Sequence, residues 1–276
     1  MRRSMFLAAV IAGVLCLNSV PLAAQTPGKV VPNPKDPLYQ SKGDQHRAYL
    51  FPDGNGVIVP YRLFVPSKWT KEQKLPMMVI LHSGNSVDVP FERGNAVLAK
   101  VAEQRGYIVL SPQGYGPGPR YNTPYSVIPV NGKPQVYVRD PRSEQDVMNA
   151  TELVAQEYNV DRDRIFLFSN SHAAAGVWYL GEKYPQVWAA IGVASGSISP
   201  EKYPFDRLKG QVSLLVVHGD KDETMSFEAA RVMAEAAKKS GVDAEWLPVK
   251  DGDHLEAWTR VFPQMLDFFD KHPKKR

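Results

Sequence analysis

A serine, an aspartate and a histidine occur in this sequence in an order and setting that suit nucleophilic catalysis. They are Ser171, Asp222 and His254, and each follows a short apolar run typical of a buried strand. A serine hydroxyl is a poor nucleophile at neutral pH unless a histidine accepts its proton, and a carboxylate must fix the tautomer of that histidine. These residue types predict acyl transfer through a covalent serine intermediate, provided that the fold brings them together.

The choice of acid and base rests on position within the loops. Among the six histidines, His254 lies in a turn-rich loop after the last expected strand. His82 and His218 end strands before small residues, where a histidine more often orders a loop by hydrogen bonding. The acid is Asp222 or Asp220, and we favour Asp222 because it lies further into its loop. The histidine spacing matches no common zinc motif, so we expect neither a metal nor another cofactor.

The serine lies where a strand changes abruptly into a helix. Residues 165–168 are β-branched and aromatic, and small residues follow Ser171. This is the setting of a nucleophile elbow, whose consensus is G-x-S-x-G. Here Ser169 and Ala173 take the glycine positions, so the pattern is degenerate, and the alternative is a loop whose serines only cap the helix. We expect the side chain of His172 to point away from Ser171.

Two backbone N–H groups are candidates for an oxyanion hole. One belongs to His172, directly after the serine, and the other to Ser83, in the loop that follows the apolar strand 77–81. Such donors stabilise the negative charge that develops on the carbonyl oxygen, and the loss of one costs about 10²–10³ in rate.

The elements that must position these residues alternate between strands and helices. Strands are expected at 48–51, 57–65, 77–81, 107–110, 165–168, 188–194, 213–217 and 244–249. Besides the helix after the serine, helices are expected at 91–105, 143–158, 226–239 and 257–269. The pattern predicts an α/β fold with a mostly parallel sheet and helices on both faces. Ligands bind beyond the carboxyl ends of such strands, where the candidate residues occur.

Two local patterns add detail to the predicted elements. Ser143-Glu-Gln-Asp146 matches a capping box that would open the helix 143–158. The preceding segment, residues 112–141, is long, irregular and rich in tyrosine (Tyr115, Tyr121, Tyr125 and Tyr137). A loop of this length is usually functional, so we interpret it as one wall of a substrate cleft, with a surface insertion as the alternative.

The N-terminus carries the features of a secretory signal peptide in residues 1–24. Arg2 and Arg3 form a basic start, an apolar stretch follows, and Ala23-Ala24 precedes a plausible cleavage site. We therefore expect a secreted or periplasmic protein without a membrane anchor, a lead-in at 25–45 and one domain at 46–276. No basic stripe interleaved with aromatic residues predicts nucleic-acid binding. The sequence gives no indication of oligomeric state.

With these residues placed, the chain resembles a secreted α/β-hydrolase of the esterase group. That group includes polyhydroxybutyrate-depolymerase-like and feruloyl-esterase-like proteins and predicted peptidases related to prolyl oligopeptidase. The resemblance covers residues 61–269 and rests on segments 79–84, 108–114, 158–165, 176–178, 184–190 and 217–222. In the acid loop of these families two residues lie between His-Gly and the aspartate, which supports Asp222. The departure is at the elbow, where Ser169, Ala173 and Ala174 replace glycines.

The resemblance implies a serine hydrolase that cleaves a small or polymeric carboxylic ester. A peptidase is the first alternative, although related peptidases commonly carry an additional propeller domain for which this chain leaves no room. A non-catalytic binding protein on a hydrolase scaffold is the second alternative, and the altered elbow is its motivation. The sequence does not identify the ester.

Overall fold

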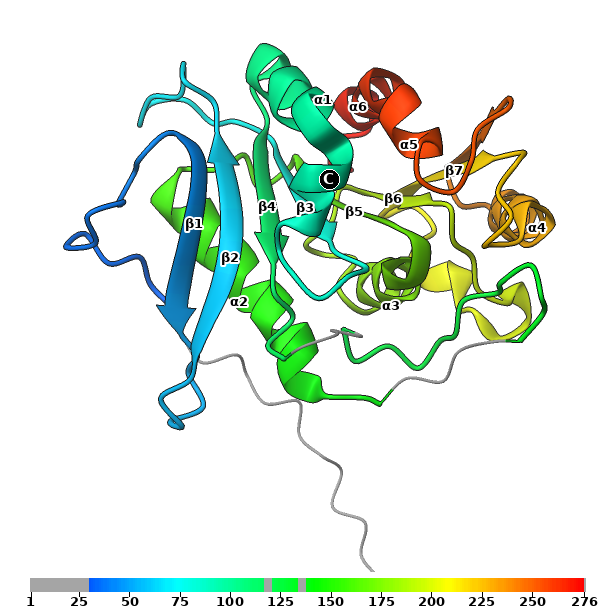
Figure 1. Cartoon of the computed structure of the whole chain (residues 1–276), viewed down its shortest axis with the longest axis horizontal. Coiled ribbons are helices and arrows are strands. Elements are labelled where there is room, and N and C mark those ends of the chain that lie inside the picture. Colours follow the sequence, from blue (N-terminus) through cyan, green and yellow to red (C-terminus); the bar gives the residue numbers. More distant parts are fainter. Residues whose placement is uncertain (1–29, 117–120, 134–137, 276) are drawn as a thin grey trace, which may run out of the picture.

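Eight strands form one sheet in the order β1-β2-β4-β3-β5-β6-β7-β8 (Figure 1). Their bounds are β1 Gly43–Leu50, β2 Ile58–Val65, β3 Met77–Leu81, β4 Ile108–Pro112, β5 Ile165–Asn170, β6 Ala190–Ala194, β7 Ser213–Gly219 and β8 Ala244–Val249. β2 is antiparallel to both β1 and β4, and all other neighbours are parallel, which confirms the predicted mostly parallel α/β fold. The computed structural model describes residues 30–116, 121–133 and 138–275, so the predicted signal peptide, residues 1–24, lies outside the described residues.

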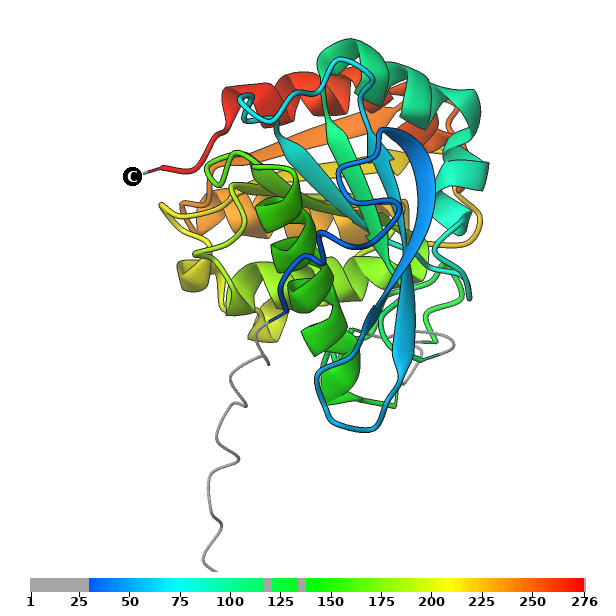
Figure 2. The ribbon, with the colours of Figure 1, turned by 90° about the vertical axis from the view of Figure 1, so that its left-hand side faces the viewer.

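Helices cover both faces of the sheet. They are α1 Val89–Arg105, α2 Pro141–Glu157, α3 Ala174–Lys183, α4 Phe227–Lys239, α5 Ala257–Arg260 and α6 Phe262–Lys271. α2, α3 and α4 pack on one face, and α1, α5 and α6 pack on the other (Figure 2). β3 shows the reason, because its alternate side chains enter different cores: Met77 and Val79 face the first set of helices, and Met78 and Ile80 face the second. A central strand buried on both faces must be apolar throughout.

Two helix boundaries differ from the sequence-based expectation. α2 begins at Pro141, with Asp140 as its N-cap accepting a hydrogen bond from the N–H of residue 142, so the predicted capping box at Ser143 is wrong. Proline suits the first turn of a helix, where its missing N–H has no intrahelical partner. The predicted helix 257–269 is two helices, α5 and α6. Pro263 lies in the first turn of α6 and has no N–H for the hydrogen bond that a continuous helix would require there. The helix is therefore interrupted between α5 and α6.

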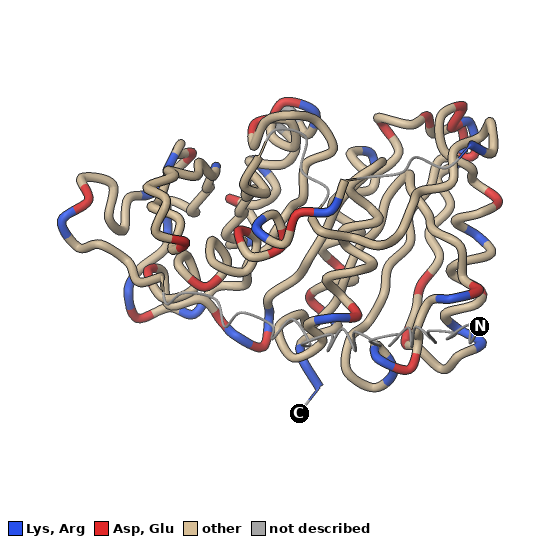
Figure 3. Tube along the Cα trace, turned by 90° about the horizontal axis from the view of Figure 1, so that it is seen from below, with Lys and Arg blue, Asp and Glu red and all other residues tan. Residues whose placement is uncertain are grey.

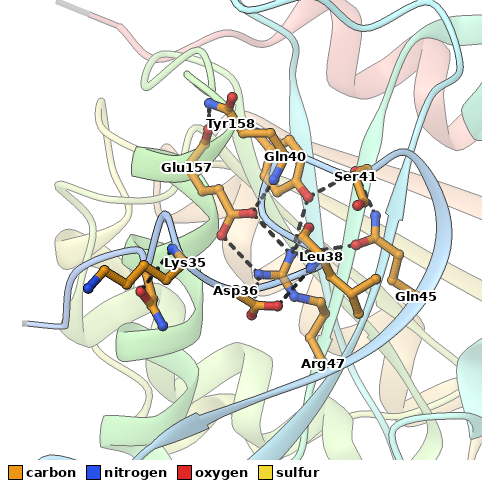
Figure 4. A network of polar contacts seen from close by, with 10 residues as sticks. Lys35, Asp36, Leu38, Gln40, Ser41, Gln45, Arg47, Glu157 and Tyr158 are labelled. Atoms are coloured by element: carbon orange, nitrogen blue, oxygen red, sulfur yellow. Dashed lines mark hydrogen bonds and ion pairs between the residues drawn. The ribbon is translucent and has the colours of Figure 1, made fainter.

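A buried arginine of β1 joins the segment before the first strand to a helix of the domain. β1 begins at Gly43, inside the predicted lead-in 25–45. Arg47 of β1 contacts Glu157 of α2 at 3.0 Å and Asp36 of the lead-in at 3.1 Å (Figure 4). The side chains of Arg47 and Glu157 are only 4% and 1% exposed. A buried charge requires such partners, and the contact with Asp36 holds the described residues before β1 against the domain.

Charged residues of both signs are interspersed along the trace (Figure 3). Many are paired: Arg62, for example, contacts Asp44 at 2.6 Å and Asp88 at 3.0 Å. Within the described ranges, no helix combines the length and the apolar character that crossing a membrane would require.

Candidate active site

Ser171 lies at a sharp and strained turn between β5 and α3. β5 ends at Asn170 in an extended conformation, Ser171 has a φ of 64°, and residues 171–173 form a short 3₁₀ turn before α3 begins. A non-glycine residue in the left-handed region costs free energy and persists only where the surrounding structure enforces it. Because β5 lies between its parallel neighbours β3 and β6, the turn stands at the carboxyl end of the sheet, as a nucleophile elbow requires.

The small residue that lets the elbow pack tightly comes from the loop after the neighbouring strand β6. Ser169 and Ala173, at the positions of the consensus glycines, are both buried. The tightest approach is to Gly196, in the loop after β6. A Cβ atom there would collide with the carbonyl oxygen of Ser171 and lie 2.7 Å from the Cβ of Ala174. The turn therefore forms with serine and alanine at the consensus glycine positions, while Gly196, in a different loop, packs against the turn.

The structure brings Ser171, His254 and Asp222 into one hydrogen-bonded chain. Nε2 of His254 lies 2.8 Å from Oγ of Ser171, and Nδ1 of His254 lies 2.9 Å from Oδ2 of Asp222. The residues come from the loops after β5, β7 and β8, which meet at the carboxyl edge of the sheet. The alternative acid, Asp220, is not part of this chain, because its Oδ1 accepts a hydrogen bond from the N–H of Asp251.

The carboxylate of Asp222 is held in its charged form. Burial alone would raise its pKa, but hydrogen bonds from His218, His254 and the N–H of Met225 hold the pKa below its ordinary value. Oδ1 accepts from the N–H groups of Thr224, at 2.8 Å, and Met225, at 2.9 Å. With the negative charge on Asp222, His254 donates from Nδ1 and leaves Nε2 to accept the serine proton.

His218 is a site residue that the sequence reading missed. Its ring is fully buried, and Nε2 lies 3.0 Å from Oδ2 of Asp222, so two histidines share one carboxylate oxygen. Nε2 also lies 3.2 Å from the carbonyl oxygen of Met225. Among the described residues Nδ1 has no hydrogen-bond partner, so we assign the proton to Nε2. The expectation that His218 orders its loop by hydrogen bonding is confirmed by its contacts with Met225 and Asp222, but its place beside the candidate acid was not predicted. The available signal was its position four residues before Asp222.

The side chain of His172 lies against the candidate nucleophile. Its Nδ1 is 3.2 Å from Oγ of Ser171, so the prediction that this side chain points away is wrong. In a strand, successive side chains point to opposite faces, but residues 171–173 form a 3₁₀ turn, where successive side chains are only about 120° apart. Oγ of Ser171 is consequently within hydrogen-bonding distance of two imidazole rings.

Ser83 reaches the elbow with its side chain. Its hydroxyl donates to the carbonyl oxygen of Asn170 and accepts from the N–H of Ala173, at 3.0 Å. The loop after β3 and the elbow after β5 meet because the two strands are parallel neighbours. The two predicted oxyanion donors, the N–H groups of Ser83 and His172, thus belong to adjoining loops. No group of three or more His, Asp or Glu side chains in the described part of the chain is arranged to hold a metal ion.

The described tyrosines of segment 112–141, Tyr115, Tyr121 and Tyr125, pack on the domain itself. The hydroxyl of Tyr121 donates to the carbonyl oxygen of His82, and that of Tyr125 donates to Glu182. The ring of Tyr115 packs edge-on against Phe51. Tyr137 lies outside the described residues. These three rings therefore have structural partners, which does not favour the predicted aromatic wall of a cleft.

The main chain of the same segment runs beside the acid loop. The N–H of Val130 donates to the carbonyl oxygen of Thr224, and the N–H of Ser226 donates to that of Ile128. The N–H of Ile128 donates to the carbonyl oxygen of Ser197, in the loop after β6. The segment thus holds the loop that carries Asp222.

The chain is similar to solved structures, but no match was found by comparison of its sequence with family models or curated proteins. A thermostable esterase is similar with a TM-score of 0.65 and 21% identity, over 84% of this chain and 63% of that one. A ferulic acid esterase has a TM-score of 0.62 and 18% identity, over 83% and 97% of the two chains. An S-formylglutathione hydrolase from Staphylococcus aureus has a TM-score of 0.61 and 14% identity, over 82% and 98%.

The likenesses extend over most of this chain, although it spans less than two thirds of the thermostable esterase. At such low identity they establish architecture. Together with the strand order and the elbow after β5, they show that the chain has the α/β-hydrolase fold.

Proposed function

We propose that this protein is a serine hydrolase that cleaves carboxylic esters through an acyl-enzyme. The observation that carries the proposal is the hydrogen-bonded chain from Ser171 through His254 to Asp222 at the carboxyl edge of the sheet. It supplies a nucleophile, a base within 2.8 Å of its hydroxyl, and an ionised orienting acid. The likeness to solved esterases supports the same reaction class.

In the proposed first half-reaction, Oγ of Ser171 attacks the ester carbonyl carbon while Nε2 of His254 takes the hydroxyl proton. The carbonyl oxygen becomes an oxyanion, which the N–H groups of His172 and Ser83 stabilise. The tetrahedral intermediate then collapses, the bond to the alkoxy oxygen breaks, and His254 returns the proton to the departing alcohol. Asp222 stabilises the imidazolium that exists between these two proton transfers.

The second half-reaction repeats the sequence with water as the nucleophile. His254 removes a proton from a water molecule, and the resulting hydroxide attacks the acyl carbon. The second tetrahedral intermediate releases Ser171, which takes its proton back from His254, and the free acid leaves. Every proton transfer uses one imidazole, so the residues of this chain complete the cycle.

Hydrolysis of short p-nitrophenyl esters by the chain without residues 1–24 tests the proposal. We expect turnover in the wild type, and a loss of about 10⁴-fold or more in Ser171→Ala, because the residual rate would come from the oxyanion hole and binding alone. Ser169→Ala is the matched control, since Ser169 is buried two residues earlier and its hydroxyl lies 3.1 Å from the carbonyl oxygen of Asn170.

A fluorophosphonate probe separates an enzyme from a binding protein on the same scaffold. An activated serine reacts with the probe, so we expect rapid labelling that requires both Ser171 and His254. A folded wild type that neither turns over esters nor reacts with the probe would overturn the proposal. Faster cleavage of peptide p-nitroanilides than of esters would replace the esterase by the peptidase alternative.

The proposed location is outside the cytoplasm, either secreted or periplasmic, and it rests on the signal-like residues 1–24. Expression of the full chain with N-terminal sequencing of the exported protein tests this. We expect the exported protein to begin at Gln25, and a cytoplasmic protein that retains Met1 would contradict the proposal.

A further inference from the structure

One peptide unit connects a buried tyrosine to a proposed oxyanion donor. The carbonyl oxygen of His82 accepts a hydrogen bond from the hydroxyl of Tyr121, at 3.0 Å. The same peptide unit carries the N–H of Ser83. No described peptide bond is cis, and a trans peptide is planar, so its carbonyl and its N–H point in opposite directions. Any contact that fixes the carbonyl of His82 therefore fixes the direction of the N–H of Ser83.

The ring of Tyr121 is locked between the elbow helix and the loop after β3. It is fully buried, and a Cβ atom on Gly176 of α3 would lie 2.7 Å from the Cδ2 of Tyr121. Its other neighbour is the ring of His82, edge-on at 6.3 Å between centroids. These neighbours restrict the ring, whose hydroxyl donates to the carbonyl oxygen of His82.

The backbone that presents Tyr121 is strained and strongly anchored. Tyr121 and Asn122 have φ values of 50° and 55°, which are unfavourable for residues with a side chain. The N–H of Tyr121 donates to Oγ of Ser143 at 2.9 Å, and the side chain of Asn122 donates to Glu144 at 2.8 Å. Two contacts to the first turn of α2 thus hold a conformation that the chain would otherwise avoid.

Other contacts fix the same loop but leave the direction of the Ser83 N–H open. The ring nitrogens of His82 lie 3.0 Å from the carbonyl oxygens of Gly84 and Gln113. The hydroxyl of Ser83 is bound to the elbow at the carbonyl of Asn170. These contacts hold side chains, and the contact with Tyr121 holds the peptide unit itself.

We propose that Tyr121 is a positioning residue of the oxyanion hole, which it orients through the peptide unit between His82 and Ser83. The inference rests on the proposed function, because it assigns a task to a donor of that reaction. It also gives Tyr121, in segment 112–141, a role other than lining a cleft: its hydroxyl aligns a donor that belongs to another loop.

Tyr121→Phe tests the proposal, because it keeps the ring against Gly176 and removes only the hydroxyl. Loss of an oxyanion donor costs about 10²–10³ in rate, and a misdirected donor retains part of its effect, so we expect kcat to fall by about 10- to 100-fold. We expect KM to change by less than about twofold, since the donor acts mainly on the transition state. The inhibition constant of a trifluoromethyl ketone, which forms an oxyanion on the enzyme, should rise by the same factor as kcat falls.

Tyr125→Phe is the matched control, because it removes a tyrosine hydroxyl from the same segment, one that contacts Glu182. We expect its kcat, and its inhibition constant for the trifluoromethyl ketone, to match those of the wild type. All assays are run below the melting temperature of each variant. Wild-type kcat in Tyr121→Phe, or a fall in kcat without weaker inhibition, would overturn the inference. Absence of Ser171-dependent turnover in the wild type would instead overturn the proposed function, so the two failures are distinguishable.

Discussion

Replacement of Asp146 by asparagine should make the protein more stable at neutral pH. Asp146 lies on α2 and is fully buried. Its Oδ1 accepts from the hydroxyl of Tyr49 at 2.6 Å, and its Oδ2 accepts from the N–H groups of Gly114 and Tyr115 at 2.6 and 3.2 Å. An asparagine can satisfy all three partners, because its oxygen can accept from the two N–H groups while its amide donates to the tyrosine oxygen. The substitution thus reproduces the protonated form of Asp146.

The pKa of Asp146 sets the size of the effect. Burial raises it from 3.8 to about 6, although the hydrogen bonds from Tyr49, Gly114 and Tyr115 oppose the rise. The unfolded chain loses this proton near pH 4 and the folded protein near pH 6. The raised pKa therefore contributes stability that is complete below pH 4 and is lost as the pH rises through 6. The difference between the two pKa values corresponds to about 3 kcal/mol of unfolding free energy.

Urea unfolding of the wild type and of Asp146→Asn between pH 4 and pH 8 measures this difference. We expect the wild type to lose about 3 kcal/mol relative to the variant as the pH rises from 4 to 7. The same substitution at the exposed Asp206 is the control for removing a carboxylate. A stability difference between wild type and Asp146→Asn that is independent of pH, or one that moves in favour of the wild type as pH rises, would refute the reasoning.

Three further substitutions probe the site and its support. His218→Phe removes a donor to the buried Asp222 carboxylate. The free energy of unfolding in urea should fall by about 2 kcal/mol, and kcat/KM should be about tenfold lower. Unchanged stability and activity would contradict the arrangement in which two histidines share this carboxylate. Gly196→Ala places a methyl group against the carbonyl oxygen of Ser171 and should lower kcat on the order of 10²-fold. An unchanged circular dichroism spectrum would show that the variant is folded. A wild-type kcat would show that the elbow tolerates the added methyl group. Glu157→Gln removes the buried one of the two carboxylates that contact Arg47 and leaves only Asp36. It should cost about 3 kcal/mol in urea with kcat per folded molecule unchanged, and a cost below about 1 kcal/mol would argue against the ion pair.

The strands and the candidate triad could be predicted because their signals are local. Segments such as Met77–Leu81 and Ile165–Asn170 are apolar throughout their cores, and a parallel strand buried on both faces needs that composition. Ser171, Asp222 and His254 were recognisable because each follows a strand, and the carboxyl ends of parallel strands share one edge of the sheet.

The sequence was also sufficient to anticipate the elbow without its glycines, because the requirement for small residues can be read along the chain. It could not reveal that Gly196 supplies the closest approach, since that contact joins loops after two different strands. The error at His172 has a related cause: the direction of a side chain depends on backbone torsion angles, and the 3₁₀ turn was not visible in the residue types.

Tertiary structure alone decided which buried polar side chains support the site and the fold. His218, Tyr121 and Asp146 are ordinary residues in the sequence, and each gains its role from a partner that the fold brings near: Asp222, the carbonyl of His82, or the backbone after β4. A buried polar group must find a partner wherever the folded chain offers one, and sequence distance does not limit that choice. Local apolar runs and the alternation of strands and helices therefore determined the elements and the edge where chemistry could occur. Three-dimensional packing determined the network that holds the candidate nucleophile, base and acid in place.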